Sequence, residues 1–483
     1  MELLVNDPTV QKKRWYLLII VGIVTAMSSF ALNAINIALP NIVSDYGITG
    51  LDVAWVQTAF ILTSTCLVVF LGRTGDSYGK IRQFKISILI LTIGLFLGGI
   101  KGSFELLIFS RVLQGIGSAL SMSVNFAIAT EIFPEHERGK ALGIVGAFLS
   151  GGGIFGPVFS GMVLERWGYH IIFWFGVPVG IIAAIMAYTM MPKDRILSGK
   201  KVDYIGFVLL AAMIICFFFG VDAAKSQGFL GTKSLLLIAG FVISLVLFIS
   251  YEKKADNPLI KLSIIKNRSM AIYLLSLFLI YTTSAFHSYM MPFYLRQALA
   301  IPAAQASLMT VVISISITVV SPYAGKFSDK YGAKNMILIG ATLIAVSQLA
   351  YVFFGLGTSS ALLIATFILT GIGSGVFQTP NNAMIMSQVP KEQLGLASGM
   401  AVLTRNLALT SGSLFASRIL FSAMSSISGQ TVESYLPDNP ELFISGMHVV
   451  YFVTFVFCAA AFVMVLIDKM KSKDTENTAQ KAK

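Results

Sequence analysis

Apolar residues along the chain gather in long runs that are separated by short polar connections. Each run approaches the ~20 residues that an α-helix needs to cross the hydrocarbon core of a bilayer. The runs lack the alternating ten-residue segments of a membrane β-barrel, so they indicate spanning helices. Fourteen such runs lie near residues 15–39, 54–71, 84–100, 104–128, 140–164, 169–191, 204–222, 234–250, 270–292, 303–323, 335–356, 360–387, 396–420 and 444–467. The predicted fold class is an all-α polytopic membrane protein with 14 transmembrane helices.

The composition agrees with this prediction and excludes other classes of protein. Hydrophobic residues make up 56% of the 483 residues and charged residues only 12%, about half of the roughly 25% that is usual in a soluble domain. A disordered chain would need low hydrophobicity. The net charge of +12 would suggest nucleic-acid binding in a soluble protein. Here the cations concentrate in alternate connections, so we expect no nucleic-acid partner.

The distribution of lysine and arginine predicts the orientation in the membrane. Cations such as Arg73, Lys80 and Arg138 lie in alternate connections, whereas the long connection 421–443 contains no lysine or arginine. Because cytoplasmic loops carry an excess of lysine and arginine, both termini are expected to be cytoplasmic, in a protein of the plasma membrane. The charged stretch 469–483 is expected to form a disordered cytoplasmic tail.

The chain also repeats itself. The pattern G-x-x-x-D-x-Y-G occurs after the second span and again, 253 residues later, after the tenth. At an offset of 256 residues, Gly115-Ile116-Gly117 matches Gly371-Ile372-Gly373, and Asn125 matches Asn381. The repeat predicts two six-helix bundles related about an axis along the membrane normal, with two further helices inserted between them. The predicted segments are 1–192 (first bundle), 193–268 (inserted helices), 269–468 (second bundle) and 469–483 (tail).

The two repeated motifs are candidate gates. Their glycines permit a tight turn, and an aspartate at a helix end can accept hydrogen bonds from a facing helix N-terminus or an arginine. Contacts of this kind hold one state and break in another; the alternative is a static loop. The candidate gating residues are Gly72, Asp76, Gly79, Gly325, Asp329 and Gly332.

Arg111, His287 and Arg405 are basic residues predicted well inside their spans. Charge at membrane depth is costly, so such residues indicate a functional site. The repeat partner of Arg111 is Phe367, so the symmetry of the fold does not require an arginine there. The alternatives are arginines that donate to backbone carbonyls, and a histidine that packs between helices instead of titrating near neutral pH. No aspartate or glutamate lies in the middle of a span.

Amide side chains inside spans would be penalised against lipid, so they are expected to line a central cleft or to join helices. An apolar pocket with a few fixed polar groups suits amphipathic organic molecules. The candidate substrate and coupling residues are Asn33, Asn36, Gln57, Arg111, Asn125, His287, Asn381 and Arg405. No residues are expected to bind a metal.

These motifs resemble the major facilitator superfamily over essentially the whole chain. The run 72–80 is similar to the family's loop between spans 2 and 3, and 111–117 to its R-x-x-Q-G-x-G motif. The fourteen spans resemble the drug:proton antiporter branch, although Ala31 stands where that branch usually has an aspartate. In the fifth-span motif, Ser160 replaces a usual glycine. The fifth span resembles the family's antiporter motif, and its small residues and proline also suit close helix packing and a bend: Gly152, Gly156, Pro157 and Gly161.

The resemblance implies a secondary transporter of amphipathic organic solutes that works by alternating access. Proton-coupled multidrug-type efflux is the leading expectation, and proton-coupled uptake of an organic anion is the alternative. An enzyme is not expected, because the sequence has no nucleophile–base pair, metal cluster or phosphate-binding loop. We expect a monomer in the bilayer, driven by a proton gradient and without a cofactor.

Overall fold

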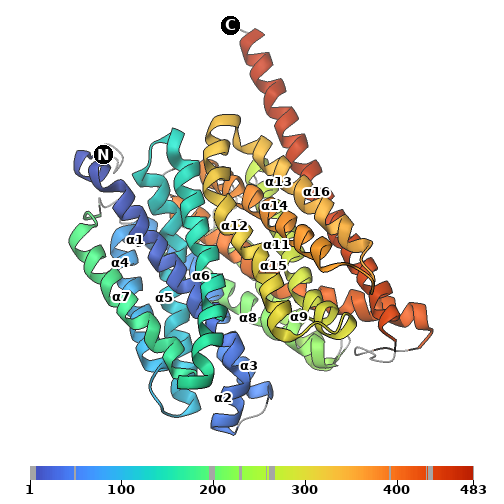
Figure 1. The fold of residues 1–483 in the computed structure, drawn as a ribbon. Helices are drawn as coiled ribbons and strands as arrows, with labels where there is room; N and C mark the ends of the chain where they lie inside the picture. The colour runs from blue at the N-terminus through green and yellow to red at the C-terminus, as the bar shows by residue number, and fades with distance from the viewer. Residues whose placement is uncertain are drawn as a thin grey trace. The chain divides into compact units, whose positions relative to one another are not determined.

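The structure is a computed structural model that describes residues 7–47, 50–194, 202–227, 231–256, 258–259, 267–390, 393–430, 432 and 439–481. Within these ranges all regular secondary structure is helical (Figure 1). Contacts between residues divide the chain into two units. Unit 1 comprises Met1–Ile265 and Met386–Leu403, and unit 2 comprises Lys266–Ile385 and Thr404–Lys483.

Unit 1 holds the first six long helices and a helical hairpin. Helix α5 packs against α3 and α4, helix α6 packs against α1, and helix α7 packs against α4. Asp7 begins α1 by accepting a hydrogen bond from the Thr9 amide (2.9 Å), and Pro8 occupies its first turn. The elements are α1 (Pro8–Asn33), the 3-10 turn η2 (Ala34–Ala38), α2 (Leu39–Tyr46), α3 (Gly50–Tyr78), α4 (Lys80–Gly98), α5 (Phe104–Ile132), the 3-10 turn η3 (Glu135–Glu137), α6 (Arg138–Trp167), α7 (His170–Met190), α8 (Tyr204–Gln227) and α9 (Thr232–Glu252).

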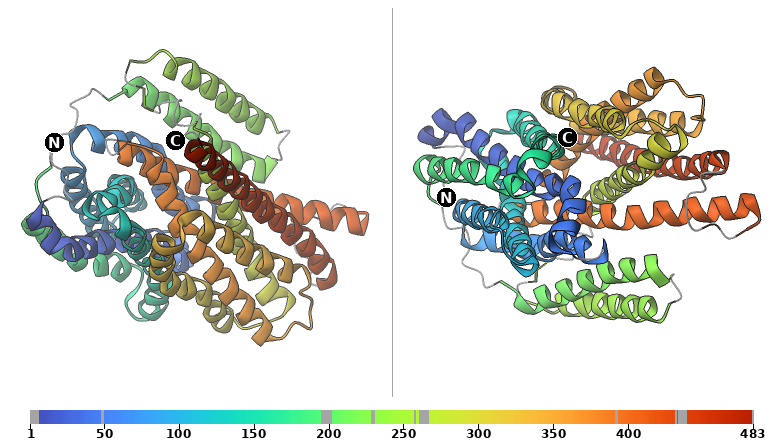
Figure 2. Two further views of the ribbon diagram at one scale, coloured as in Figure 1. Left: turned by 90° about the horizontal axis from the view of Figure 1, so that it is seen from above. Right: turned by 60° about the horizontal axis from the view of Figure 1, so that its bottom comes forward.

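The α8–α9 hairpin belongs to unit 1 through its contact with α3. Its two helices lie side by side in both views of Figure 2. Aromatic rings make the contact with α3: Trp55 lies 5.6 Å from Phe219, and Phe70 lies 4.5 Å from Phe207.

Unit 2 holds the second set of six long helices. Helix α16 packs against both α13 and α11. The core of the unit includes Phe286, Met290, Tyr294 and Tyr451. The elements are α11 (Arg268–Phe293), the π-helical turn η4 (Tyr294–Ala298), α12 (Ala303–Tyr331), α13 (Ala333–Val352), α14 (Ser360–Ser387), α15 (Leu394–Ser428) and α16 (Pro440–Lys481). The first ten residues of α15 are grouped with unit 1.

The repeat is visible in equivalent contacts within each unit. A Cβ on Gly115 of α5 would lie 2.8 Å from the Phe60 carbonyl oxygen of α3, and a Cβ on Gly371 of α14 would clash with the Ile313 carbonyl oxygen of α12. Similarly, Gly117 and Gly373 allow close approach to the third helix of their own unit. The paired glycines therefore serve the same packing of the fourth helix against its neighbours.

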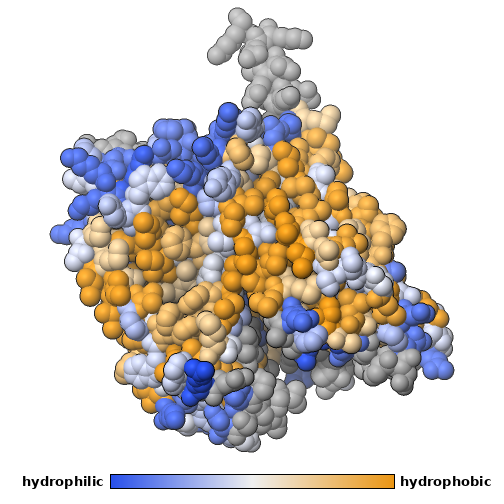
Figure 3. Space-filling view, in the orientation of Figure 1, coloured by the Kyte–Doolittle hydropathy of each residue, from blue (hydrophilic) through white to orange (hydrophobic). Residues whose placement is uncertain are grey.

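The fourteen predicted spans correspond to fourteen long helices. Among the described residues, thirteen helices are long and apolar enough to cross a membrane, and α8 has a shorter apolar stretch, Tyr204–Gly220. In unit 1 the flanks of the helices are apolar and their ends are polar (Figure 3). The helices confirm the all-α polytopic fold class.

Two local expectations were wrong. The motif after the second span is not a loop, because α3 continues to Tyr78 and Gly79 alone turns the chain into α4 with a φ of +114°. Glycine adopts this φ without the steric penalty of a side chain. The polar stretch from residue 469 is helical through Lys481 instead of disordered, since it contains good helix formers and no proline or glycine.

Candidate gating and transport sites

Asp76 lies two residues before the end of α3, and its side chain is 3% exposed. Its Oδ1 accepts a hydrogen bond from the Gly395 amide (2.9 Å) and its Oδ2 from the Leu396 amide (2.9 Å). These amides open α15, and a carboxylate at a helix N-terminus satisfies unpaired N–H groups and complements the helix dipole. Asp76 therefore fixes the start of α15 on α3, all within unit 1.

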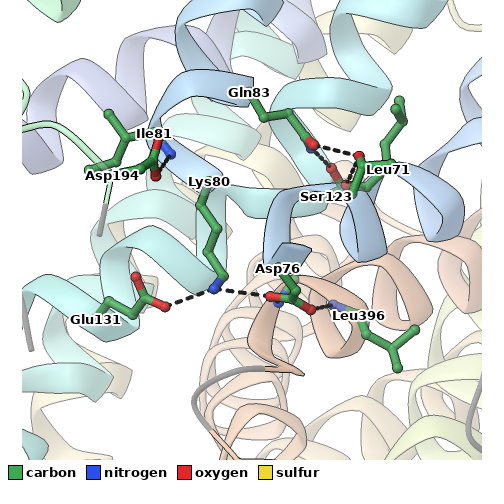
Figure 4. A network of polar contacts seen from close by, with 11 residues as sticks. Leu71, Asp76, Lys80, Ile81, Gln83, Ser123, Glu131, Asp194 and Leu396 are labelled. Atoms are coloured by element: carbon green, nitrogen blue, oxygen red, sulfur yellow. Dashed lines mark hydrogen bonds and ion pairs between the residues drawn. The ribbon is translucent and has the colours of Figure 1, made fainter. Parts of the chain in front are cut away.

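Lys80 links this aspartate to α5. Its ammonium lies 3.0 Å from Asp76 Oδ1 and 2.9 Å from Glu131 Oε1 (Figure 4). The side chains of Lys80 and Asp76 are buried, and that of Glu131 is 14% exposed. Asp76, Lys80, Glu131 and the amides of Gly395 and Leu396 are called the Asp76 clamp below. Sequence reasoning found Asp76 but missed Lys80 and Glu131, although the four-residue spacing of Asp76 and Lys80 was an available signal.

Close backbone approach explains the glycine of the same motif. A Cβ on Gly72 would clash with the Gly395 carbonyl oxygen, and a Cβ on Gly399 would lie 2.9 Å from the Val68 carbonyl oxygen. Ser398 donates a hydrogen bond to the Met122 carbonyl of α5 (3.0 Å). Gly72 thus lets the backbones of α3 and α15 approach closely. Asp76, one turn later, accepts the hydrogen bonds of the α15 amides.

Asp194, which sequence reasoning also missed, caps the helix that follows the motif. It accepts hydrogen bonds from the Ile81 amide (2.9 Å) and the Arg82 amide (2.6 Å). A Cβ on Gly79 would clash with this carboxylate. Gly79 is therefore required both by its φ and by the space that Asp194 occupies.

Unit 2 has the same turn but a different ion pair. Asp329 lies two residues before the end of α12, and Gly332, with a φ of +88°, separates α12 from α13. Gly325, the partner of Gly72, is buried one turn earlier. The residues equivalent to Lys80 and Glu131 are Ala333 and Ser387, so unit 2 cannot repeat the lysine–glutamate pair of the clamp.

The lysine at this end of unit 2 is held from another helix. Lys334 Nζ lies 2.8 Å from Asp468 Oδ2 on α16. Asp468 also accepts hydrogen bonds from the hydroxyl groups of Ser269 and Tyr273 on α11 (2.7 Å each). No sequence signal pointed to this cluster, because its members come from three helices.

Arg111 lies in the interior of unit 1 and is 0% exposed. Its Nε donates to the Val56 carbonyl (2.7 Å), and its Nη1 donates to the Ala31 carbonyl (2.8 Å) and to Gln114 Oε1 (2.6 Å). Phe60 covers the guanidinium with its ring centroid 4.8 Å away. Arg111 is therefore a hydrogen-bond hub between α5, α1 and α3, and its partners are neutral.

Asn125 and Asn381, which are repeat partners, join the fourth helix of each unit to its first. Asn125 Nδ2 donates to the Thr25 hydroxyl (2.7 Å), and Asn381 Nδ2 donates to the Tyr273 carbonyl (3.1 Å). Both residues are fully buried. Their direct role is to hold helices of their own unit together.

His287 lies within an aromatic cluster of unit 2. Its ring centroid is 5.2 Å from Tyr351, 5.6 Å from Phe367 and 6.3 Å from Tyr451, and its Nδ1 is 3.4 Å from the Tyr451 hydroxyl. The side chain is 8% exposed. Phe367, the repeat partner of Arg111, thus contacts the one basic residue predicted in the ninth span.

The other candidate residues have different surroundings. Arg405 on α15 hydrogen-bonds Tyr281 on α11. Asn33 donates to the Ser29 carbonyl of its own helix (2.8 Å), and Gln57 is half-buried on α3. The side chain of Asn36 lies outside the described residues.

The glycines of α6 divide into two groups. A Cβ on Gly152 would clash with Ala26 of α1, and one on Gly156 would lie 3.1 Å from the Ala34 amide. A Cβ on Gly161 would meet nothing within 4 Å. Gly152 and Gly156 therefore serve packing against α1 and η2, next to Pro157 inside the helix. Among the described residues no cluster of histidine, cysteine and acidic side chains could hold a metal.

The fold and these contacts agree with the comparison with known families. The sequence profile of the Major Facilitator Superfamily matches residues 21–286 and, in a second match, residues 273–483. The chain belongs to this superfamily. Its members are membrane transporters of small molecules and not enzymes, so this protein is a multi-pass membrane transporter.

Curated relatives within the superfamily cover most of the chain. A riboflavin transporter (RibZ) of Clostridioides difficile is 32% identical over 84% of this chain and 88% of its own length. A multidrug resistance protein B homolog of Mycobacterium tuberculosis is 25% identical over 82% of this chain and 74% of its own. The lincomycin resistance protein LmrB of Listeria monocytogenes is 25% identical over 75% of this chain and 77% of its own.

A solved structure of the superfamily has a similar fold. The human organic anion transporter MFSD10 (TETRAN) matches with a TM-score of 0.67 over 95% of this chain and 100% of that chain. The sequence identity is 14%, so the similarity concerns the fold alone.

Proposed function

We propose that this transporter moves amphipathic organic solutes by alternating access, in proton-coupled, multidrug-type efflux. The observation that supports alternating access is the Asp76 clamp, in which one carboxylate accepts two hydrogen bonds from amides in the first turn of α15. Such a contact can be complete in one state and broken in another, which is how a ligand or proton shifts a two-state equilibrium. The names of the multidrug and lincomycin resistance relatives support the solute class and the direction.

The proposed substrate and coupling residues are those that combine polarity with membrane depth. Arg111 and His287 are basic groups in apolar surroundings, which is the usual composition of a site that fixes an organic molecule. Arg405, Gln57 and Asn33 are less buried polar residues of the proposed set. Asn36, Asn125 and Asn381 complete the proposed set.

An uptake symporter for an organic anion is the second candidate. The riboflavin transporter among the relatives supports a defined metabolite as the solute in place of a range of drugs. The basic residues Arg111, His287 and Arg405 support an anion. The two candidates differ in the direction of flux relative to the proton gradient.

We propose that residues 1–192 and 269–468 form two six-helix bundles and that 193–268 contributes two inserted helices. The basic connections support a plasma-membrane orientation with cytoplasmic termini, including the tail 469–483. In this orientation the Asp76 clamp and the equivalent turn at Gly325, Asp329 and Gly332 lie at the cytoplasmic side. The protein is proposed to act as a monomer.

Proteoliposomes test the direction and the coupling. Solute flux and internal pH are measured after a pH gradient of either sign is imposed. Efflux coupling is supported if solute moves against the direction of proton flow, and symport if both move together. Equal flux with and without the gradient would overturn proton coupling in both candidates.

A further inference from the structure

The guanidinium of Arg111 has no counter-charge among the groups that contact it. Its Nε and both Nη1 hydrogens bond to two backbone carbonyls and one amide oxygen. Its Nη2 is buried and has no hydrogen-bond partner. Arginine stays protonated in proteins, so the interior of unit 1 contains a full positive charge with two unused N–H donors.

The fold does not explain this charge. The position equivalent to Arg111 in unit 2 is Phe367, which is also fully buried and packs against His287. The position equivalent to Gln114 is Thr370, which bonds Tyr351 (2.8 Å). Unit 2 thus builds the same packing of its fourth helix without a buried cation. In unit 1 the guanidinium also joins three helices, but unit 2 shows that the packing of the fourth helix does not require a cation. A cation that is costly at membrane depth and is absent from the equivalent position points to a ligand.

Position 31 is the natural place for a counter-charge within the protein. The Ala31 carbonyl accepts from Arg111 Nη1 (2.8 Å), so a carboxylate on the same residue would start beside the guanidinium. Alanine supplies no carboxylate, and Arg111 Nη2 has no hydrogen-bond partner. No carboxylate among the described residues contacts the guanidinium, so a bound solute can supply the counter-charge.

We propose that Arg111 Nη2 binds the anionic group of the transported solute, which makes amphipathic monoanions, such as carboxylates with an aromatic or aliphatic body, the substrate class. The inference rests on the proposed transport of amphipathic solutes and applies to either direction of transport. In the described conformation Phe60 covers the guanidinium, so the anion binds in the open state of the cycle. The two unused N–H donors of Nη2 then form charge-assisted hydrogen bonds to the carboxylate of the solute.

Three probes of matched size test the charge preference in proteoliposomes: dansyl-glycine, its primary amide and a dansyl quaternary ammonium. Leak through protein-free liposomes is subtracted. The anion is expected to be transported about 10- to 100-fold faster than the amide, the range that a hydrogen bond to a charged group contributes. Equal or faster transport of the amide or the cation would overturn the inference and leave the proposed transport of amphipathic solutes standing. Transport of none of the three would overturn that proposal and the inference with it.

Two substitutions then test the site. Ala31→Asp would pair with Arg111 internally and is expected to abolish the preference for the anion, whereas the matched control Ala31→Asn should retain it. In folded Arg111→Gln the ratio of anion to amide transport should fall to about one, whatever the absolute rate, which keeps the test decisive if Ala31→Asp does not fold. A persistent anion preference in folded Arg111→Gln would assign the anion site to another residue.

Discussion

At the scale of single residues, the Asp76 carboxylate has three partners that a neutral amide cannot replace together. It accepts two amide hydrogen bonds from α15 and pairs with Lys80. Asp76→Asn retains one acceptor oxygen and loses the charge. Because each hydrogen bond to a charged group is worth about 1.5–3 kcal/mol, we expect initial flux to fall about tenfold or more while the protein still reaches the membrane.

The matched control for this change is Glu135→Gln, which removes an exposed acid (83% of its side chain) and should leave flux unchanged. Flux and membrane abundance are measured in the same preparation. Unchanged flux of Asp76→Asn at unchanged abundance would limit this residue to an architectural role.

The charge balance of the clamp gives a second prediction. Removing the ammonium with Lys80→Met leaves the buried Asp76 and the partly buried Glu131 without their cation. Breaking a buried ion pair costs about 3–5 kcal/mol. The double variant Lys80→Met with Glu131→Gln removes one of the two unpaired acids and should recover part of this loss. Thermal unfolding in detergent measures both, and a double variant less stable than the single one would contradict the pairing.

At the scale of helices, small residues set how closely α5 approaches its neighbours. A Cβ on Gly117 would lie 2.6 Å from the Leu91 amide nitrogen of α4, which is backbone and cannot turn away. Gly117→Ala should therefore reduce the yield of folded protein strongly, whereas Gly161→Ala, which meets open space, should not. Size-exclusion chromatography of the two variants makes the comparison, and equal yields would show that α5 has room to shift.

The sequence predicted the helices well because a long apolar run has few alternatives in a bilayer. It did not predict where helices end. The run 72–80 looked like a loop because it is polar and rich in glycine, yet the chain is helical up to Tyr78. The polar residues after 468 were predicted to be disordered because they are too hydrophilic to lie in the bilayer. Hydrophilic residues can still have high helix propensity, and these residues continue α16.

The candidate site was predicted in part, and the division has a physical cause. Asp76 and Arg111 were found because their chemistry is unusual at their place in the chain. Their partners were not found, because Glu131, Asp194 and the amides of α15 meet them only through tertiary packing. A spacing in sequence cannot report a contact between helices that are far apart in the chain.

At the scale of the whole molecule, the distribution of cations predicts the sidedness of the two long helices α15 and α16. In a background without Cys66, Cys216 and Cys458, Gln430→Cys should react with an impermeant maleimide in intact cells. Lys481→Cys should react only after the cells are permeabilised. The reverse pattern would invert the proposed orientation, and with it the side on which the Asp76 clamp lies.

The clamp also has a consequence for biosynthesis. Asp76 bonds to amides that follow it by 319 and 320 residues. At about 5–20 residues per second, the ribosome delivers them roughly 15 to 60 seconds after α3. During that interval the helices of the nascent first unit can pack, and Lys80 can pair with Asp76 and Glu131. The face at Gly72 stays uncovered, because the α15 backbone that contacts it has not yet been made. A chain that terminates before residue 394 would leave that face open permanently, so a truncated product differs from the finished transporter at a defined surface that membrane proteases and chaperones can recognise.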